Sequence, residues 1–378
     1  MSLHPDFTFA CRQLGSELLS RGFRCMFALC ITLTFISVGQ PVFSQDFPPD
    51  GLFSNDDVLN ITLSGNIREL VKDRKEESQY KPFNLSYQEK DGAWVSIPIE
   101  VKTRGHFRKT QGGCSYPPML FNFSKQKEVK HTLFRHQNKL KLVTPCRDEK
   151  FVVREYLAYK LSNLITPKSF GARLVKVIYD DTVSGKKSTP LYGILLEEED
   201  QMAKRNNAKL LEKKLVRPQQ TQTDDFMNMA VFNFLIGNTD WSVQYLQNIK
   251  LITTENSEVP SAVPYDFDHA GIVEAPYAKP AEQLMLSTIR ERRYRGYCIN
   301  DMAQFDKVFG HFNELKEKIY GVYTKSTLLE EGYIKSTSKY LDEFYKTINT
   351  PQAAKVAFQY PCNPNGTGNV VIKGLSKE

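Results

Sequence analysis

The chain has 378 residues, enough for one large or two ordinary domains, and its hydrophobic fraction of 41% and charged fraction of 25% are ordinary for a globular protein. The formal net charge of +7 is mild and spread along the chain, so it permits phosphorylated ligands without indicating nucleic acid. The sequence has no zinc-finger or RNA-recognition signature, and we therefore expect no nucleic-acid partner.

Residues 1–44 have the pattern of a secretory signal peptide. Arg21 and Arg24 precede an apolar run that extends to Val38, and small or apolar residues before Gln45 offer a cleavage site. A single N-terminal membrane anchor is the alternative, although the run is short for a membrane span. We expect cleavage and export to the periplasm, the cell surface or the exterior, with no transmembrane segment in the mature chain.

Export predicts an oxidising compartment for the four cysteines of the mature chain, which are Cys114, Cys146, Cys298 and Cys362. Their spacing fits no zinc site. Pairing of Cys114 with Cys146 and of Cys298 with Cys362 is one of three possible connectivities, and buried free thiols are the alternative.

Residues 45–200 are expected to be rich in strands. Val58–Leu63 and Trp94–Val101 alternate polar and apolar residues, which is typical of strands half-buried in an antiparallel sheet. A turn that carries Arg104 and Arg108 follows, and guanidinium groups suit phosphate oxygens. The turn does not match a Gly-x-Gly-x-x-Gly loop, and an ordinary basic hairpin is the alternative.

The next segments predict a strand, a helix and a second hairpin. Lys139–Val143 is a strand whose lysines share one face. Asp148 is a good N-cap for a helix over Glu149–Leu164, which has apolar residues at core spacing. Residues 173–179 and 190–196 are the strands of the hairpin, and an acidic run follows them.

A buried helix and a third hairpin follow. The helix over Asp225–Ile236 is almost continuously apolar and ends at Gly237, as helices commonly do. Asp240 lies in the polar loop after it. Residues 248–253 and 262–268 then predict two paired strands.

This third hairpin predicts a cluster of oxygen ligands. If its turn centres near Ser257, Asn248 and Asp266 face each other at the open end. Asp268 points to the same side as Asp266, and Asp240 enters from the preceding loop. One amide oxygen and two or three carboxylates in one place suit Mg²⁺ or Mn²⁺.

The order of a loop aspartate, an asparagine that begins a strand and an Asp-Phe pair that ends its partner resembles the active-site order of protein kinases. Gly237-Asn-Thr-Asp-Trp241 with Tyr265-Asp-Phe-Asp268 looks most like the spore-coat protein H (CotH-like) kinases, with HipA-type kinases more distant. The chain lacks His-Arg-Asp, and it has Asp268 in place of the glycine of Asp-Phe-Gly. Asp240 and Asn248 are eight positions apart, against five in ordinary kinases.

This resemblance implies an α+β, protein-kinase-like bilobal fold. An antiparallel β-rich N-terminal lobe over residues 45–200 would bind the nucleotide. A mainly helical C-terminal lobe over residues 201–350 would carry the catalytic loop and the metal, and residues 351–378 would form a tail.

The resemblance also implies transfer of the γ-phosphoryl group of ATP to a protein hydroxyl, with Mg²⁺ or Mn²⁺ as the metal. Asp240 would position the acceptor. Lys141 would hold the nucleotide phosphates, and Glu155 would orient Lys141. The residues assigned in this way are Asp240 for catalysis; Lys141, Glu155, Arg104 and Arg108 for the nucleotide; and Asn248, Asp266 and Asp268 for the metal.

A basic segment over residues 287–297 occupies the place of a kinase activation or substrate-binding segment. Its arginines suit an acidic substrate or a phosphate, and a solvated face is the alternative. Residues 302–323 and 330–348 predict helices. The candidate substrate-binding residues are Arg290, Arg292, Arg293 and Arg295.

Two other functions are compatible with the same residues. A catalytically inactive protein could act as a scaffold or binding module at the cell surface, where ATP is scarce. A surface domain could instead use the aspartates to bind calcium. Protection of the protein by nucleotide against thermal unfolding would distinguish an enzyme from the inactive scaffold. Calcium binding without any nucleotide effect would favour the calcium-binding domain.

Overall fold

The structure is a computed structural model, and it describes residue 47 and residues 51–110, 113–123, 127–297, 299 and 301–358. The predicted leader with its cleavage site, the tail beyond residue 358, and Cys298 and Cys362 lie outside these described residues. Within the described part, no helix has the length and apolar character that crossing a bilayer requires.

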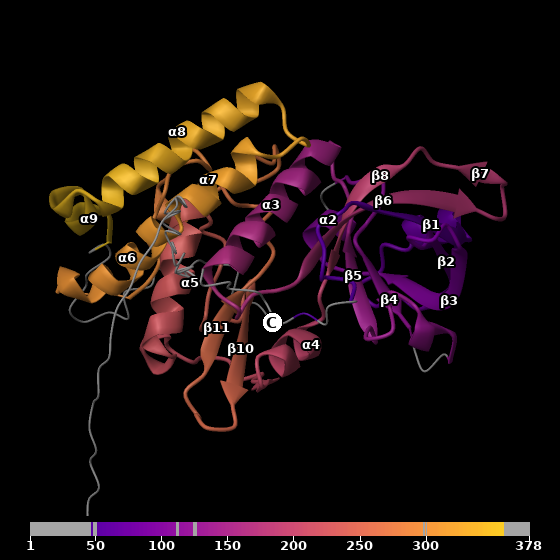
Figure 1. Ribbon diagram of the computed structural model, residues 1–378, viewed down its shortest axis with the longest axis horizontal. Helices are drawn as coiled ribbons and strands as arrows, with labels where there is room; N and C mark the ends of the chain where they lie inside the picture. The colour runs from indigo at the N-terminus through magenta and orange to yellow at the C-terminus, as the bar shows by residue number, and fades with distance from the viewer. Residues whose placement is uncertain are drawn as a thin grey trace, which may run out of the picture. The chain divides into compact units, whose positions relative to one another are not determined.

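The N-terminal part of the described chain is a closed β-barrel (Figure 1). Its strands follow the order β1-β2-β3-β4-β5-β8-β6, and β6 pairs back with β1 to close the barrel. This closing pair is parallel, with Leu59 opposite Val175, whereas the other neighbours are antiparallel. The strands are β1 (Leu59–Gly65), β2 (Lys81–Gln88), β3 (Trp94–Thr103), β4 (Met119–Asn122), β5 (Lys139–Val143), β6 (Ala172–Asp181) and β8 (Leu191–Leu196), and β7 (Lys186–Lys187) extends β6 outside the barrel.

The barrel is filled by its own side chains. Alternate residues of each strand point inward, as the period of two in the sequence requires. Leu63, Leu85, Val101 and Phe121 lie on four successive strands, belong to one apolar core and are fully buried. The interior is therefore a packed core rather than a channel.

The predicted kinase-like bilobal fold, with an antiparallel β-rich N-terminal lobe over residues 45–200, is wrong. The sheet of this region closes on itself through β1 and β6, which are far apart in the sequence. Local alternation predicts strands, but it does not say which two edges of a sheet meet. Closure also leaves the barrel without the free edges of an open sheet.

The rest of the described chain is mainly helical, with a small antiparallel sheet in the order β11-β10-β9. The sheet consists of β9 (Ala208–Leu210), β10 (Ile249–Thr254) and β11 (Ser261–Pro264). The helices are α1 (Ile67–Lys72) and α2 (Phe107–Thr110) beside the barrel, then α3 (Glu149–Ile165), α4 (Glu199–Arg205), α5 (Thr223–Ile236), α6 (Asp306–Glu314), α7 (Lys316–Thr324), α8 (Glu331–Ile348) and α9 (Pro351–Phe358). Short 3₁₀ turns cover Lys127–His131, Pro218–Gln220, Glu282–Leu284 and Met302–Phe305.

The helices α3 and α5 hold the candidate site from the core side, and the structure confirms that both were predicted correctly as helices. Asp148 caps α3, since its Oδ1 accepts a hydrogen bond of 2.9 Å from the backbone N–H of Lys150. Gly237 ends α5 in the left-handed conformation, with φ 68°. A Cβ at Gly237 would lie 2.1 Å from Tyr340 Oη, so this position requires glycine for space as well as for its backbone angles.

The helix α3 joins the two regions. Its sequence lies within residues 45–200, but its buried residues belong to the apolar core of the helical region. It contacts β6 and β8 of the barrel as well as α5 and α7 (Figure 1). Side chains on α3 can therefore reach groups from both regions.

Candidate functional site

The β10–β11 hairpin forms one side of the site. Ile249 pairs with Pro264, and the carbonyl of Asn248 accepts a hydrogen bond of 3.0 Å from the N–H of Tyr265. The prediction that Asn248 faces Asp266 is therefore wrong by one residue. The register centres the turn between residues 256 and 257, half a residue before the predicted centre.

The backbone at the open end of this hairpin redirects the two side chains. Asn248 has φ 50° and directly precedes β10, and Asp266 has φ 61° and lies two residues after the end of β11. This left-handed conformation costs about 1–2 kcal/mol for a residue with a Cβ, although asparagine and aspartate tolerate it best. Such strain is concentrated at functional sites, where the surrounding structure fixes it.

Phe267 anchors the two aspartates that flank it. Its ring is fully buried, 4.7 Å from the ring centroid of Tyr159 and 5.3 Å from that of Phe232. The N–H of Asp266 also donates to Tyr159 Oη at 2.8 Å. Phe267 therefore enters the core between α3 and α5, while Asp266 and Asp268 share the side that faces the site, as predicted.

Asp240 lies in a loop held by buried asparagines. Its N–H donates to Asn238 Oδ1 at 3.1 Å, and Asn238 Nδ2 donates to Asn233 Oδ1 of α5 at 2.9 Å. The side chain of Asn248 reaches the same residue, because its Nδ2 donates to the carbonyl oxygen of Asp240 at 2.8 Å and to Oδ2 at 3.0 Å. The structure thus brings Asp240 and Asn248 together, as the sequence predicts.

The three aspartates form a region of concentrated negative charge. Burial raises the pKa of Asp240, and the charge of Asp268 adds to the rise. Burial and the charge of Asp268 also raise the pKa of Asp266, to about 6. We call Asp240, Asp266 and Asp268 the carboxylate cluster. Burial and mutual repulsion raise the pKa of Asp240 and Asp266, and a bound cation would relieve that repulsion.

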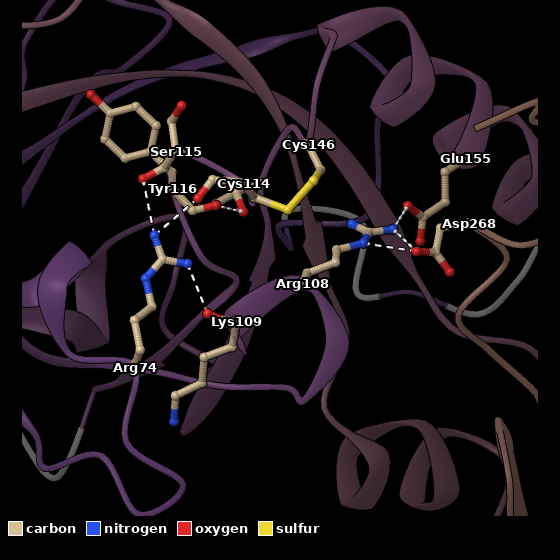
Figure 2. The surroundings of a disulfide bond; sticks show 10 residues. Arg74, Arg108, Lys109, Cys114, Ser115, Tyr116, Cys146, Glu155 and Asp268 are labelled. Atoms are coloured by element: carbon tan, nitrogen blue, oxygen red, sulfur yellow. Dashed lines mark hydrogen bonds and ion pairs between the residues drawn. A yellow bond between two sulfur atoms is a disulfide. The ribbon is translucent and has the colours of Figure 1, made fainter. Parts of the chain in front are cut away.

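Arg108 bridges two buried carboxylates (Figure 2). Its Nη2 lies 2.6 Å from Glu155 Oε2 on α3, and its Nε lies 2.9 Å from Asp268 Oδ2. Burial raises the pKa of Glu155 to about 8. Burial also opposes the charged form of Asp268, but the charges of Arg108 and His269 and the hydrogen bonds of Asp268 together lower its pKa. Arg108 is therefore engaged by carboxylates instead of facing a nucleotide phosphate, which was its predicted role.

Lys141 has a different partner from the predicted one. Its ammonium group forms an ion pair with Glu199 at the start of α4, and Lys250 Nζ lies 3.4 Å from the same carboxylate. Glu155 pairs with Arg108 instead of orienting Lys141. The ammonium group of Lys141 also lies 5.5 Å from the ring centroid of Tyr265, which directly precedes Asp266 of the carboxylate cluster.

Arg104 lies on the barrel side of the cluster. It follows β3 directly and is half-buried, and its backbone N–H donates to Pro118 O at 2.8 Å. After burial, its charge is the largest cause that lowers the pKa of Lys141, and it also opposes the rise in the pKa of Asp266. Within the described part of the chain no carboxylate lies within ion-pair distance of Arg104, so its guanidinium is suited to an anion.

The arginines of the basic segment have mainly structural contacts. Arg290 forms an ion pair with Glu274. Arg292 donates to the carbonyls of Leu235 and Tyr340, at 3.2 and 2.6 Å. Arg295 is buried and donates to backbone carbonyls of the Asp240 loop. Arg290, Arg292 and Arg293 are half-buried, and Arg295 is buried. The substrate-binding role expected for these four arginines stays a prediction.

The carboxylate cluster fits a cation that takes part of its coordination from a substrate. Among the residues that the structure describes, no three His, Cys, Asp or Glu side chains are arranged as a complete metal site. Mg²⁺ needs no such site, because it is usually held by one or two carboxylates with phosphate oxygens and water. Asp266, Asp268 and the amide oxygen of Asn248 match that donor set, since Asn248 Nδ2 is committed to Asp240.

Sequence reasoning missed three members of the site. Glu199 lies in an acidic run that resembles ordinary charge at a strand end, and Tyr159 resembles any core residue of α3. Lys250 alternates correctly in β10, and only the ion pair with Glu199 singles it out. No protein-family model matches the chain, and no curated protein matches it either.

Proposed function

We propose that this protein transfers the γ-phosphoryl group of ATP to a protein hydroxyl, with Mg²⁺ or Mn²⁺ bound at the carboxylate cluster. The observation that carries the proposal is the pairing of opposite charges around Asp266. Asp240 and Asp268 lie on its acidic side, and Arg104 acts on it from the barrel side. Lys141 is influenced by the same Arg104, and its ammonium group lies 5.5 Å from the ring centroid of Tyr265, which precedes Asp266. A metal–triphosphate complex carries both a cation and an anion, and it needs both kinds of partner.

On the acidic side, Asp266 and Asp268 would hold the metal together with the amide oxygen of Asn248. A bound Mg²⁺ neutralises the negative charge that develops on the phosphates during transfer. Both contacts of Arg108 with Asp268 are to Oδ2, so Oδ1 would be the oxygen that reaches the metal.

On the basic side, Arg104 and Lys141 would bind phosphate oxygens. Glu199 is shared by Lys141 and Lys250. A phosphate can therefore take Lys141 as a partner while Glu199 keeps Lys250, so nucleotide binding need not leave this half-buried carboxylate without a cation.

Asp240 would act on the acceptor. Its carboxylate is oriented by Asn248, and its raised pKa favours acceptance of a proton. In the proposed step the acceptor oxygen forms a bond to the γ-phosphorus and the bond to the bridging β-phosphate oxygen breaks. The hydroxyl proton passes to Asp240, and ADP leaves.

The test compares two conservative variants with a surface control. Asp240→Asn should lower turnover by about 100-fold or more and leave nucleotide affinity nearly unchanged, because a general base contributes about 10²–10⁴ in rate. Asp266→Asn should weaken metal-dependent nucleotide binding by about tenfold or more as well. Asp224→Asn, at an exposed ion pair with Lys307, should change neither quantity. Calorimetric ATP titration and mass spectrometry of phosphorylated protein measure both effects.

A binding module without catalysis is the second candidate, and one observation favours it. Arg108 already neutralises part of the negative charge of Glu155 and Asp268 without any added cation. If ATP with Mg²⁺ or Mn²⁺ does not raise the melting temperature of the parent protein, the phosphotransferase proposal fails and the binding module remains. Stabilisation by Ca²⁺ alone, with no nucleotide effect, would assign the cluster to calcium.

A further inference from the structure

We propose that Arg295 is a positioning residue for Asp240, which holds the loop of residues 238–241 in the conformation that phosphoryl transfer requires. The inference rests on the proposed function for its catalytic consequence. Its structural part, that Arg295 fixes this loop, stands on contacts within the protein.

Arg295 binds the chain on both sides of Asp240. Its Nη1 donates to the carbonyl oxygen of Thr239 at 2.6 Å and to that of Trp241 at 2.6 Å. All three of these residues are buried, with Arg295 only 5% exposed. One charged group therefore fixes the peptide plane that precedes Asp240 and the plane between Trp241 and Ser242, the second one after it.

The backbone N–H and carbonyl of Asp240 itself are hydrogen-bonded as well. Its N–H donates to Asn238 Oδ1 at 3.1 Å, and its carbonyl accepts from Asn248 Nδ2 at 2.8 Å. Together with Arg295, these contacts determine the direction of the Cα–Cβ bond of Asp240. Rotation about the side-chain bonds is then the main freedom left to the carboxylate, which is the condition for a preorganised site.

Arginine is suited to this place for physical reasons. It stays charged when buried, and its planar group can serve two carbonyls at once. The guanidinium carbon lies 5.7 Å from the ring centroid of Trp241, so the indole covers it from water. Burial lowers the pKa of Arg295 to about 10, and the charge of Asp240 opposes this fall by favouring the charged guanidinium.

Arg292 provides a matched control from the same segment. It is also largely buried and donates to two backbone carbonyls, those of Leu235 and Tyr340. Neither carbonyl borders Asp240. Arg292 also forms an ion pair with Glu343 at 3.4 Å, so Arg292→Met removes at least as many contacts as Arg295→Met, and only the Arg295 change affects the Asp240 loop directly.

The experiment uses the two tryptophans of the chain. Trp94 is 71% exposed at the start of β3, whereas Trp241 is 2% exposed in the Asp240 loop. A Trp94→Phe parent therefore reports the loop through Trp241 alone. Arg295→Met, Arg295→Lys and Arg292→Met are made in this parent, and emission maximum, acrylamide quenching, ATP affinity and turnover are measured well below each melting temperature.

We expect Arg295→Met to shift Trp241 emission to the red, to increase quenching and to lower kcat by about 100-fold, because misplacement by about 1 Å can cost that much. ATP affinity should stay within about twofold, and Arg295→Lys should recover part of both losses. Arg292→Met should leave the emission of Trp241 unchanged even if it melts at a lower temperature.

Two results would overturn the inference. One is parent-like fluorescence and kcat in Arg295→Met, and the other is an equal response of Trp241 in Arg292→Met. If Arg295→Met does not fold, Arg295→Lys must still show the partial fluorescence change. If the parent transfers no phosphoryl group, the proposed function fails, while the fluorescence comparison still decides whether Arg295 fixes the loop.

Discussion

At the scale of single residues, the site is a balance of buried charges. Arg108 holds Asp268 and Glu155 together, and its charge keeps the pKa of Asp268 below its ordinary value despite burial. Glu155 has the opposite shift, because burial raises its pKa to about 8. One oxygen of Glu155, Oε1, is buried without a hydrogen-bond partner within the described structure, which fits a carboxyl group that keeps its proton.

This shift predicts how stability depends on pH. Between about pH 4.5 and 8 folded Glu155 keeps a proton that the unfolded chain has lost, so its contribution to stability falls as the pH rises through this range. Glu155→Gln cannot ionise and keeps an oxygen for Arg108. We expect it to match the parent near pH 5 and to be more stable at pH 8, in urea unfolding at both values. Glu331→Gln, at an exposed position, is the control, and a Glu155→Gln variant that is less stable at pH 8 would contradict the pKa argument.

At the scale of elements, the site depends on a few anchored segments. Phe267 enters the core between Tyr159 of α3 and Phe232 of α5, and its two neighbours in sequence face the cluster. The position of Asp266 and Asp268 thus follows from the packing of one aromatic ring.

Loss of that ring should destabilise the protein and the cluster together. Phe267→Ala is expected to cost about 3–5 kcal/mol of unfolding free energy, as is usual for a fully buried phenylalanine. Phe267→Leu should cost less, because leucine fills part of the space. Urea unfolding measures both. Val183→Ala, at a position 72% exposed, serves as the control and should change stability by less than about 0.5 kcal/mol. Equal losses in the alanine and leucine variants would argue against an anchoring role.

The same elements show what sequence could predict. The start of α3 follows from the N-cap at Asp148, and the end of α5 follows from Gly237. The apolar residues within each helix supply the rest of the signal. The hairpin was found, but its register was missed by one residue, because a turn of polar residues leaves its centre undefined.

Long-range partners were the part that sequence could not supply. Glu155 was expected to meet Lys141, yet the structure pairs each with another residue, Arg108 and Glu199. Charge and order along the chain make several such pairs possible, and only the closed barrel decides among them. The pairing of β1 with β6 that closes the barrel is itself a contact without a local signal.

At the scale of the whole described unit, the site lies where the barrel meets the helical region. The barrel side contributes Arg104, Arg108 and Lys141, and the helical side contributes the carboxylate cluster. The chain that carries Arg108 is held to the barrel by Arg74, which donates to the carbonyls of Lys109 and Cys114 (Figure 2).

A disulfide between Cys114 and Cys146 holds the same segment to the chain that leads into α3 (Figure 2). Its presence confirms one of the two expected cysteine pairs. Both cysteines are buried, and Arg108 and Glu155 lie on the segments that the bond connects. The disulfide therefore limits the movement of Arg108 relative to its partner on α3.

The last prediction concerns this bond. It closes a loop with a sequence separation of 32 residues, for which the chain-entropy model gives about 3–4 kcal/mol of stabilisation. The double variant Cys114→Ser with Cys146→Ser should unfold at a lower urea concentration than the oxidised parent, and reductant should bring the parent down to the same midpoint. The weakened hold on Arg108 should also reduce nucleotide affinity, which calorimetric titration with ATP and Mg²⁺ measures.

Arg74→Met, which loosens the same segment without touching a sulfur atom, is the matched control: it should lower nucleotide affinity in the same direction and remain sensitive to reductant. A parent whose midpoint does not change on reduction would contradict the prediction, and a double variant that still responds to reductant would show that another disulfide contributes to its stability.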